Sequence, residues 1–243
     1  MGLSSNIVWH QTSKEGLMGI LQEQQIRFSY AKESVFSKDF SFAVPMISVC
    51  DLSLADTNEY LGKYGGYCIG LSKQWANGLG FTPVWYCAPN TTCLKTLRMY
   101  LDNSIIIKEL FIKDYKLYYD FIYILSHIKD TEGPLPKKGY KNYRFYDERE
   151  LRLVPSIEEL KDINQEPIIL DLRNFKQSKS LLSLGVAFSF NDIKFIIVKD
   201  KKDIEEIRNL LITKFSDASI PIFTCDDIIK NVIGVNHNTK NLK

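Results

Sequence analysis

The sequence has few of the side chains that usually build a metal centre. Its only histidines are His10, His127 and His237, which are far apart and form no His-x-x-x-His pair. Five cysteines, an odd number, include no Cys-x-x-Cys pair, which argues against a zinc ribbon and against a disulfide framework. We therefore expect no metal cofactor and a reducing, cytoplasmic environment.

Strong net charge and long apolar runs are also missing. With 31 basic and 29 acidic residues, the net charge of +2 is too small to hold nucleic acid or an anionic membrane by overall electrostatics. No stretch approaches ~18 uninterrupted apolar residues, and the N-terminus lacks the features of a secretory signal. We expect a protein that is neither exported nor membrane-spanning. The absence of a Walker loop, a dinucleotide-binding glycine fingerprint and a kinase signature disfavours those enzyme classes.

The composition that is present, 45% apolar, 12% aromatic and 25% charged, is typical of a globular protein. The 243 residues can form one large domain or two tightly packed lobes, with enough chain for a real core. We predict a single domain over residues 1–243. A Gly-, Pro- and Lys-rich stretch at about 131–140 predicts a flexible loop, and the polar tail at about 234–243 is expected to fray.

Apolar periodicity predicts an α+β protein. Alternating or continuous apolar runs indicate strands at 7–9, 26–30, 42–49, 67–71, 83–87, 168–170 and 188–198. Three-to-four-residue spacing indicates helices after the Thr12–Glu15 capping-box pattern, at 56–64, on the stripes that begin at Leu94 and Leu117, and at 203–215. Pro45 predicts an edge position or a bulge, because proline cannot complete a central ladder.

Two places could carry chemistry. His10 and Thr12 lie at the predicted junction of strand and helix, where free helix N–H groups can receive a polar ligand. Further on, Glu148, Glu150 and Arg152 alternate along a predicted strand and share one face. Two carboxylates on one face raise each other's pKa unless a cation compensates. The arrangement is therefore either a surface ion pair or a pair of functional acids. Cys50 with His10 as a nucleophile pair is less favoured, because Cys50 sits in an apolar strand.

Four ordered motifs carry a family resemblance. They are Trp9-His10-Gln11-Thr12, the run from Val44 to Asp51, the run from Lys63 to Trp75, and the run from Phe145 to Pro155. In this order they resemble the AbiGi family of abortive phage resistance proteins. The resemblance extends over nearly the whole chain, to Phe190–Val198. It implies a role in bacterial phage defence.

The same segments are more remotely similar to the ADP-ribosyltransferase fold, in which a split mixed or antiparallel sheet is flanked by helices. This resemblance implies NAD as a substrate, with His10 and Thr12 opening its pocket. It implies that Glu150 stabilises the positive charge on the nicotinamide ribose and that Glu148 acts as an accessory acid. Three tyrosines compete for stacking on nicotinamide: Tyr30, Tyr64 and Tyr67.

Two classes of function follow. One is an enzyme of NAD-dependent ADP-ribosyl transfer or NAD cleavage, whose acceptor is a protein or a nucleic acid. The other is a noncatalytic, antitoxin-like regulator that binds a partner toxin or a phage protein. The AbiGi resemblance implies this regulator, because AbiGi proteins are described as the antitoxin-like member of a two-gene system whose toxin is nucleotidyltransferase-like. Convergence of His10, a tyrosine and Glu150 on one cleft would favour the enzyme.

Overall fold

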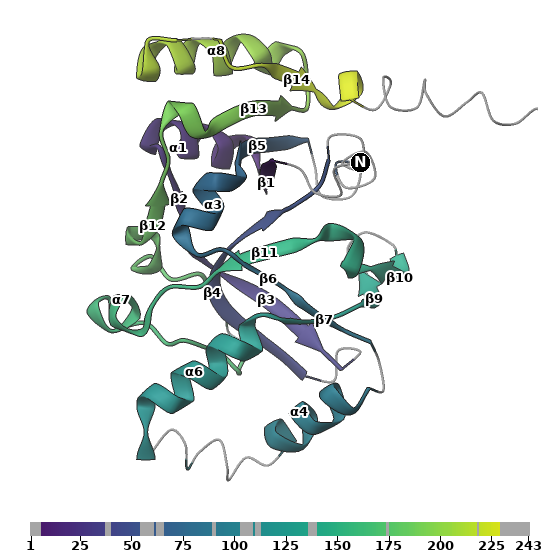
Figure 1. The fold of residues 1–243 in the computed structure, drawn as a ribbon. Helices are drawn as coiled ribbons and strands as arrows, with labels where there is room; N and C mark the ends of the chain where they lie inside the picture. Colours follow the sequence, from purple (N-terminus) through teal and green to yellow (C-terminus); the bar gives the residue numbers. More distant parts are fainter. Residues whose placement is uncertain are drawn as a thin grey trace, which may run out of the picture. The chain divides into compact units, whose positions relative to one another are not determined.

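The structure is a computed structural model of the chain (Figure 1). It describes residues 6–36, 40–53, 61, 66–88, 91–102, 109, 113–135, 140–173, 175–217 and 219–228. Contacts group the chain into two compact units, each assembled from segments far apart in sequence. The first unit comprises 1–26, 49–80 and 186–243, and the second comprises 27–48 and 81–185. The single domain expected over 1–243 stays a prediction, and each unit is described by itself.

The first unit is a sheet with helices. Its elements are β1 (Ile7–Thr12), α1 (Lys14–Glu23), β5 (Tyr67–Ser72), α3 (Lys73–Leu79), the 3-10 turn η4 (Phe190–Asp192), β13 (Ile193–Val198), α8 (Lys202–Phe215) and β14 (Ile222–Thr224). The strand order is β14-β13-β5-β1. β13 and β14 are parallel, whereas β1 and β13 are both antiparallel to β5. Two short strands, β2 (Gln25–Arg27) and β12 (Gly185–Ala187), lie where the chain passes between the units.

A glycine at the centre of this sheet lets two aromatic rings meet. Gly70 pairs with Trp9 of β1 on one side and with Phe195 of β13 on the other. The two ring centroids are 4.0 Å apart. A Cβ atom on Gly70 would come within 2.5 Å of the Phe195 ring, so this position accepts no larger residue without displacing the ring. Trp9 and Phe195 then form the core of the unit together with Cys50, Cys68 and Ile197.

The second unit contains β3 and β4 with helices packed on them (Figure 1). Its elements are β3 (Ser29–Val35), β4 (Phe40–Cys50), β6 (Thr82–Pro83), β7 (Trp85–Cys87), α4 (Thr92–Asp102), α6 (Tyr115–Ser126), β8 (Ile128–Asp130), β9 (Glu132–Leu135), β10 (Tyr140–Arg144), the 3-10 turn η2 (Phe145–Glu148), β11 (Glu150–Leu153), α7 (Ile157–Asp162) and the 3-10 turn η3 (Leu181–Ser183). β4 extends by two residues into the first unit, where Cys50 pairs with Trp9. Within the second unit β4 lies between β3 and β11, and β6 follows β11. β7 and β8 form a parallel pair, and β9 and β10 form an antiparallel hairpin.

The α+β class with a mixed, mostly antiparallel sheet is confirmed, and several local predictions are corrected. The N-cap of α1 is Ser13, whose hydroxyl accepts from Gly16 N–H, and not Thr12. The predicted strand at 83–87 is two short strands, and the one at 188–198 begins only at Ile193 after a 3-10 turn. Ile169 forms a single bridge to Ala43 in place of a strand. In the stretch expected to be a loop at about 131–140, residues 132–135 form β9, whereas 136–139 lie outside the described residues.

Pro45 is not at a bulge, because the pairing of β4 with β3 keeps one register. Pro45 lies opposite Tyr30, whose backbone N–H and C=O bond instead to the Gln177 side chain. This position of the β3–β4 ladder therefore needs no donor from residue 45, which makes a proline acceptable there.

The predicted stripe that begins at Leu117 is confirmed in part, because Leu125 and Ile128 are buried and Phe121 packs against the same core. Leu117 and Ile124 are 49% and 44% exposed, whereas Tyr118, Ile122 and Leu125 are buried in the core shared with α4, β3 and β4. The sequence of α6 has apolar residues on more than one face, so spacing alone could not choose between them. Of the helix predicted at 56–64 only Leu61 is described, and it is helical and buried. The lysines at 137 and 138 and the tail at 234–243 lie outside the described residues. Where the chain is described, no helix combines the length and apolar character that crossing a bilayer requires.

Candidate functional site: a buried charge cluster in the second unit

Five charged side chains from four elements of the second unit form the buried charge cluster. They are Glu33, Lys129, Glu148, Glu150 and Arg152. Arg152 is fully buried, and Glu148 and Glu150 are only 5% and 6% exposed. The prediction that the two acids share one strand is wrong, because Glu148 ends η2 and Arg149 turns the chain with φ of 45° before β11 begins. The alternative that these side chains form an ion pair on a surface strand is also wrong, because all three are buried.

Arg152 is the central cation of the cluster. Its Nε donates to Glu150 Oε1 at 2.8 Å and its Nη2 donates to Glu150 Oε2 at 3.1 Å, a bidentate pair between alternate residues of β11. Nη2 also lies 2.9 Å from Glu33 Oε1 on β3, and Nη1 donates to the backbone oxygen of Ser126. Arg152 therefore ties β11 to β3 and to the end of α6.

Lys129 of β8 supplies the second cation. Its Nζ donates to Glu150 Oε2 at 2.8 Å and to Glu148 Oε2 at 3.2 Å. The same ammonium lies 4.9 Å from the centroid of the Phe145 ring, within the range of a cation–π contact. Lys129 thus compensates the two glutamates that the sequence singled out, and the cluster sets three carboxyl groups against two cationic side chains.

The electrostatics keep Glu150 ionised although it is buried. Burial by itself would raise its pKa, but the adjacent Arg152 and then Lys129 outweigh burial and hold the pKa well below its usual range. The pKa values of Lys129 and Arg152 are both raised, because their neighbouring carboxylates outweigh the opposing effect of burial. The three groups therefore keep one another charged across the ordinary pH range.

Tyr86 connects the cluster to an exposed aromatic side chain. Its hydroxyl oxygen accepts from the backbone N–H of Glu150 at 2.9 Å, and burial raises the pKa of the phenol. Its ring meets that of Tyr146 edge to face, with centroids 5.3 Å apart. Tyr146 is 57% exposed. Tyr86 therefore holds the start of β11 in place from β7.

His127 lies at the end of α6 beside the cluster. Its Nδ1 donates to the backbone oxygen of Tyr123 at 2.8 Å, since a carbonyl can only accept, and its ring packs on the Tyr123 ring. Burial, aided by the positive charge of Arg152, lowers the pKa of His127. The imidazole is accordingly neutral at pH 7.

The geometry limits what Glu150 can do chemically. Both of its carboxylate oxygens accept hydrogen bonds from cationic side chains, and its backbone N–H is bonded to Tyr86. A carboxylate that stabilises a developing positive charge on a substrate must present an oxygen to that substrate. The contacts of Glu150 are those of an ion pair that organises the fold. Sequence reasoning found Arg152 as a partner but missed Lys129, Glu33 and Tyr86, which no local pattern links to β11.

The other predicted site residues lie in different surroundings. His10 is half-buried on β1 opposite Ile69, and Thr12 lies opposite Tyr67 with its side chain against Gly16, both in the first unit. Tyr30 lies in the second unit and is 3% exposed; its hydroxyl donates to the backbone oxygen of Glu166 at 2.6 Å.

Tyr67 and Tyr64 are the two remaining candidates for stacking on nicotinamide. The hydroxyl of Tyr67 donates to Asp203 Oδ2 at 2.7 Å, within the first unit. Tyr64 lies outside the described residues. A shared cleft for His10, a tyrosine and Glu150 stays a prediction.

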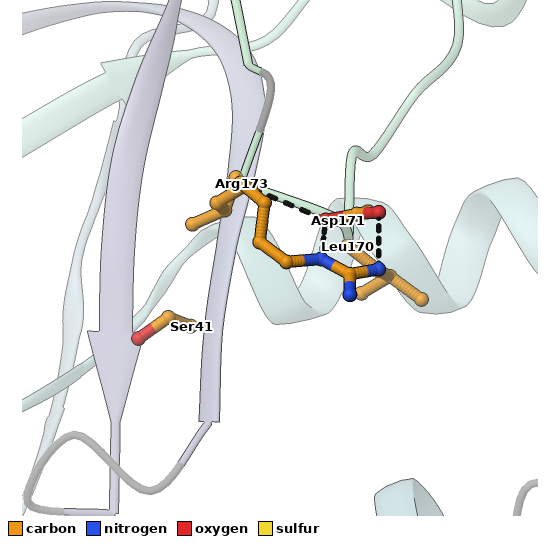
Figure 2. A pocket seen from close by; sticks show the side chains of 5 residues that line it. Ser41, Leu170, Asp171 and Arg173 are labelled. Carbon is orange, nitrogen blue, oxygen red and sulfur yellow. Dashed lines mark hydrogen bonds and ion pairs between the residues drawn. The ribbon is translucent and has the colours of Figure 1, made fainter.

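Elsewhere in the second unit lies an open hollow with a volume of about 610 Å³. Figure 2 shows the side chains that line it. Its lining comprises Ser41, Leu170, Asp171, Leu172 and Arg173. Arg173 Nε and Nη2 donate to the two oxygens of Asp171 at 2.8 and 2.7 Å, and both side chains are exposed. None of the predicted site residues lines this hollow. Among the described residues, no three His, Cys, Asp or Glu side chains are grouped so that they could hold a metal ion.

Comparison with known proteins finds one family. Residues 15–199 match the family model described as "Putative abortive phage resistance protein AbiGi, antitoxin". This range contains every member of the buried charge cluster. No curated protein and no solved structure matches the chain.

Proposed function

The chain belongs to the AbiGi family, and from this membership we propose that it is the antitoxin of an abortive phage resistance system and acts by binding a cognate toxin. The observation that carries the proposal is the family match over residues 15–199. A protein that acts by binding needs a well-ordered surface and no reactive group. The internal ion pairs of Glu150 are compatible with that role.

The buried charge cluster supports a binding role through rigidity. It joins β3, β8, η2 and β11 by charge-assisted hydrogen bonds, which are stronger and more directional than neutral ones. Buried ionic groups contribute more to a unique arrangement than to net stability in some proteins, and we propose that role here. The cluster would then hold the exposed aromatic rings of Trp85 and Tyr146, 53% and 57% exposed, on a fixed framework.

The proposal is tested by co-expression with a candidate cognate toxin. We expect the full chain to restore growth of cells that produce the toxin and to co-purify with it. The Arg173→Met variant, which changes only an exposed ion pair, serves as the matched control for expression and folding. Growth arrest that persists at full expression of soluble protein, without co-purification, would refute the antitoxin role.

The NAD-dependent enzyme is the second proposal. In it His10 and Thr12 hold NAD, Tyr30 or Tyr64 stacks on nicotinamide, and Glu150 and Glu148 act on the ribose and the acceptor. It requires Lys129 or Arg152 to release an oxygen of Glu150 when NAD binds, because both oxygens are engaged. Calorimetric titration with NAD, followed by mass spectrometry for released nicotinamide, decides it. NAD binding without release of nicotinamide would support a transferase-like fold that serves regulation. A regulator of this kind could bind a phage protein in place of a toxin.

A further inference from the structure

Two cysteines of the second unit lie side by side although neither belongs to a recognisable motif. Cys87 is the last residue of β7 and Cys93 is the second residue of α4, and their sulfur atoms are 3.8 Å apart. Cys93 is exposed, whereas Cys87 is half-buried. Both are thiols in this structure. A disulfide needs a sulfur separation of about 2.05 Å, so the two sulfur atoms must come closer together before they can be joined.

The backbone on both sides of the pair is anchored. The carbonyl of Cys87 accepts from Thr131 N–H at 3.1 Å, which fixes the end of β7. Thr91 holds the start of α4, since its backbone oxygen accepts from Lys95 N–H at 3.0 Å and its hydroxyl donates to the Ala88 oxygen at 3.0 Å. The two sulfur atoms are therefore held near each other by the fold and not by chance contact of two mobile side chains.

We propose that Cys87 and Cys93 form a redox site that hydrogen peroxide closes into an intramolecular disulfide. This proposal is independent of whether the protein acts as an antitoxin or as an enzyme. It rests on the contact between the two sulfur atoms, on the exposure of one of them and on their anchored backbones.

The exposed Cys93 meets the oxidant first. Its thiol loses a proton, and the thiolate attacks one oxygen of the peroxide. The O–O bond breaks, the departing hydroxide takes up that proton and leaves as water, and Cys93 becomes a sulfenic acid. The sulfur of Cys87 then attacks the sulfenic sulfur, the S–S bond forms and the S–O bond breaks. The proton of Cys87 leaves with that oxygen as a second water. In total two thiols lose two electrons and two protons while one peroxide becomes two water molecules.

The order of these steps follows from the surroundings. Burial, followed by the hydrogen bond to Cys93, raises the pKa of the Cys87 thiol to about 11, which keeps it protonated and unreactive toward peroxide at neutral pH. The remaining cysteines are poorly placed to compete. Cys50 and Cys68 are buried in the core of the first unit, and Cys225 is half-buried with its thiol donating to the Gly66 oxygen.

Closure would link the end of β7 to the first turn of α4. Tyr86, the residue before Cys87, accepts the hydrogen bond from Glu150 N–H. Oxidation would thus fix the strand that supports the buried charge cluster, and a thiol reductant would release it. Because the cross-link restricts the unfolded chain, we expect the oxidised protein to unfold at a higher temperature than the reduced protein.

Peptide mapping of the intact protein tests the site directly. Trypsin cleaves after Lys73 and Lys95, so one peptide, residues 74–95, contains both cysteines and no other. After treatment with hydrogen peroxide and blocking of free thiols, we expect this peptide to carry no blocking group. Its mass should be about 2 Da below that of the fully reduced, unblocked peptide, because two hydrogen atoms are lost. Dithiothreitol should restore both blockable thiols.

Single substitutions distinguish this site from general oxidation. Cys87→Ser should leave Cys93 as a sulfenic acid that dimedone labels, and Cys225→Ser, the matched control, should still form the cross-link. The proposal is overturned if peptide 74–95 keeps two blockable thiols after peroxide, if the cross-link involves another cysteine, or if it joins two chains. Equal dimedone labelling of Cys93 in the unsubstituted protein and in Cys87→Ser would also overturn it.

Discussion

Replacing Arg152 by methionine should be among the most destabilising single changes in the second unit. The guanidinium is fully buried and bonds to both oxygens of Glu150, to Glu33 and to the Ser126 carbonyl. Methionine fills much of the same volume but leaves the buried Glu150 and the half-buried Glu33 short of their cation. Breaking a buried ion pair by removing one partner costs ~3–5 kcal/mol. At ~2–4 °C per kcal/mol for a chain of this size, the melting temperature should fall by about 6–20 °C.

Urea unfolding followed by circular dichroism measures this loss, with Arg173→Met as the control. Arg173 also forms a bidentate pair with a carboxylate, but its side chain is 86% exposed, so its replacement should leave the midpoint unchanged. Adding Glu150→Gln to Arg152→Met should recover part of the loss, because it removes one of the stranded charges. A midpoint for Arg152→Met equal to that of the control would refute the account of the cluster as a buried, mutually dependent network.

The remaining predictions concern packing, pH and ligand binding. Gly70→Ala should lower the free energy of unfolding by ~1–3 kcal/mol, because the new Cβ meets the Phe195 ring. Gly19→Ala should raise the free energy of unfolding by ~0.5–1 kcal/mol, because Gly19 lies in α1 with open space around it. The urea midpoints of the two variants test both expectations. Because the folded-state pKa of His127 is lowered, the unfolded chain binds a proton that the folded chain does not, so stability should fall as the pH drops below about 6.5. His127→Gln should show a shallower fall between pH 7 and pH 5, and equal slopes would exclude His127 as the cause. In the NAD proposal, His10→Ala should weaken NAD binding measured by calorimetry, because one typical hydrogen bond is worth ~0.5–1.5 kcal/mol, and should change the melting temperature by no more than a few degrees.

The sequence alone determined the elements whose pattern is local. β1 followed by α1, and β13 followed by α8, were predicted because apolar alternation and three-to-four-residue spacing depend only on neighbouring residues. The four motifs that carry the AbiGi resemblance are also local, and the family match over residues 15–199 contains three of them, whereas Trp9–Thr12 precedes the matched range. The Glu150 and Arg152 pair was predicted for the same reason, since residues two apart on a strand share a face.

Tertiary structure decided what those residues are used for. An alternating Glu-x-Arg pattern is the same on an exposed strand and on a buried one, and only the packing of β3, β8 and β11 places it in the interior. Lys129 reaches Glu150 across 21 positions of the chain, a pairing that no periodicity encodes. The contact of Cys87 with Cys93 likewise depends on where α4 begins relative to the end of β7. Long-range contacts of this kind are selected by the burial of many side chains together, so they cannot be read from the few residues that make them.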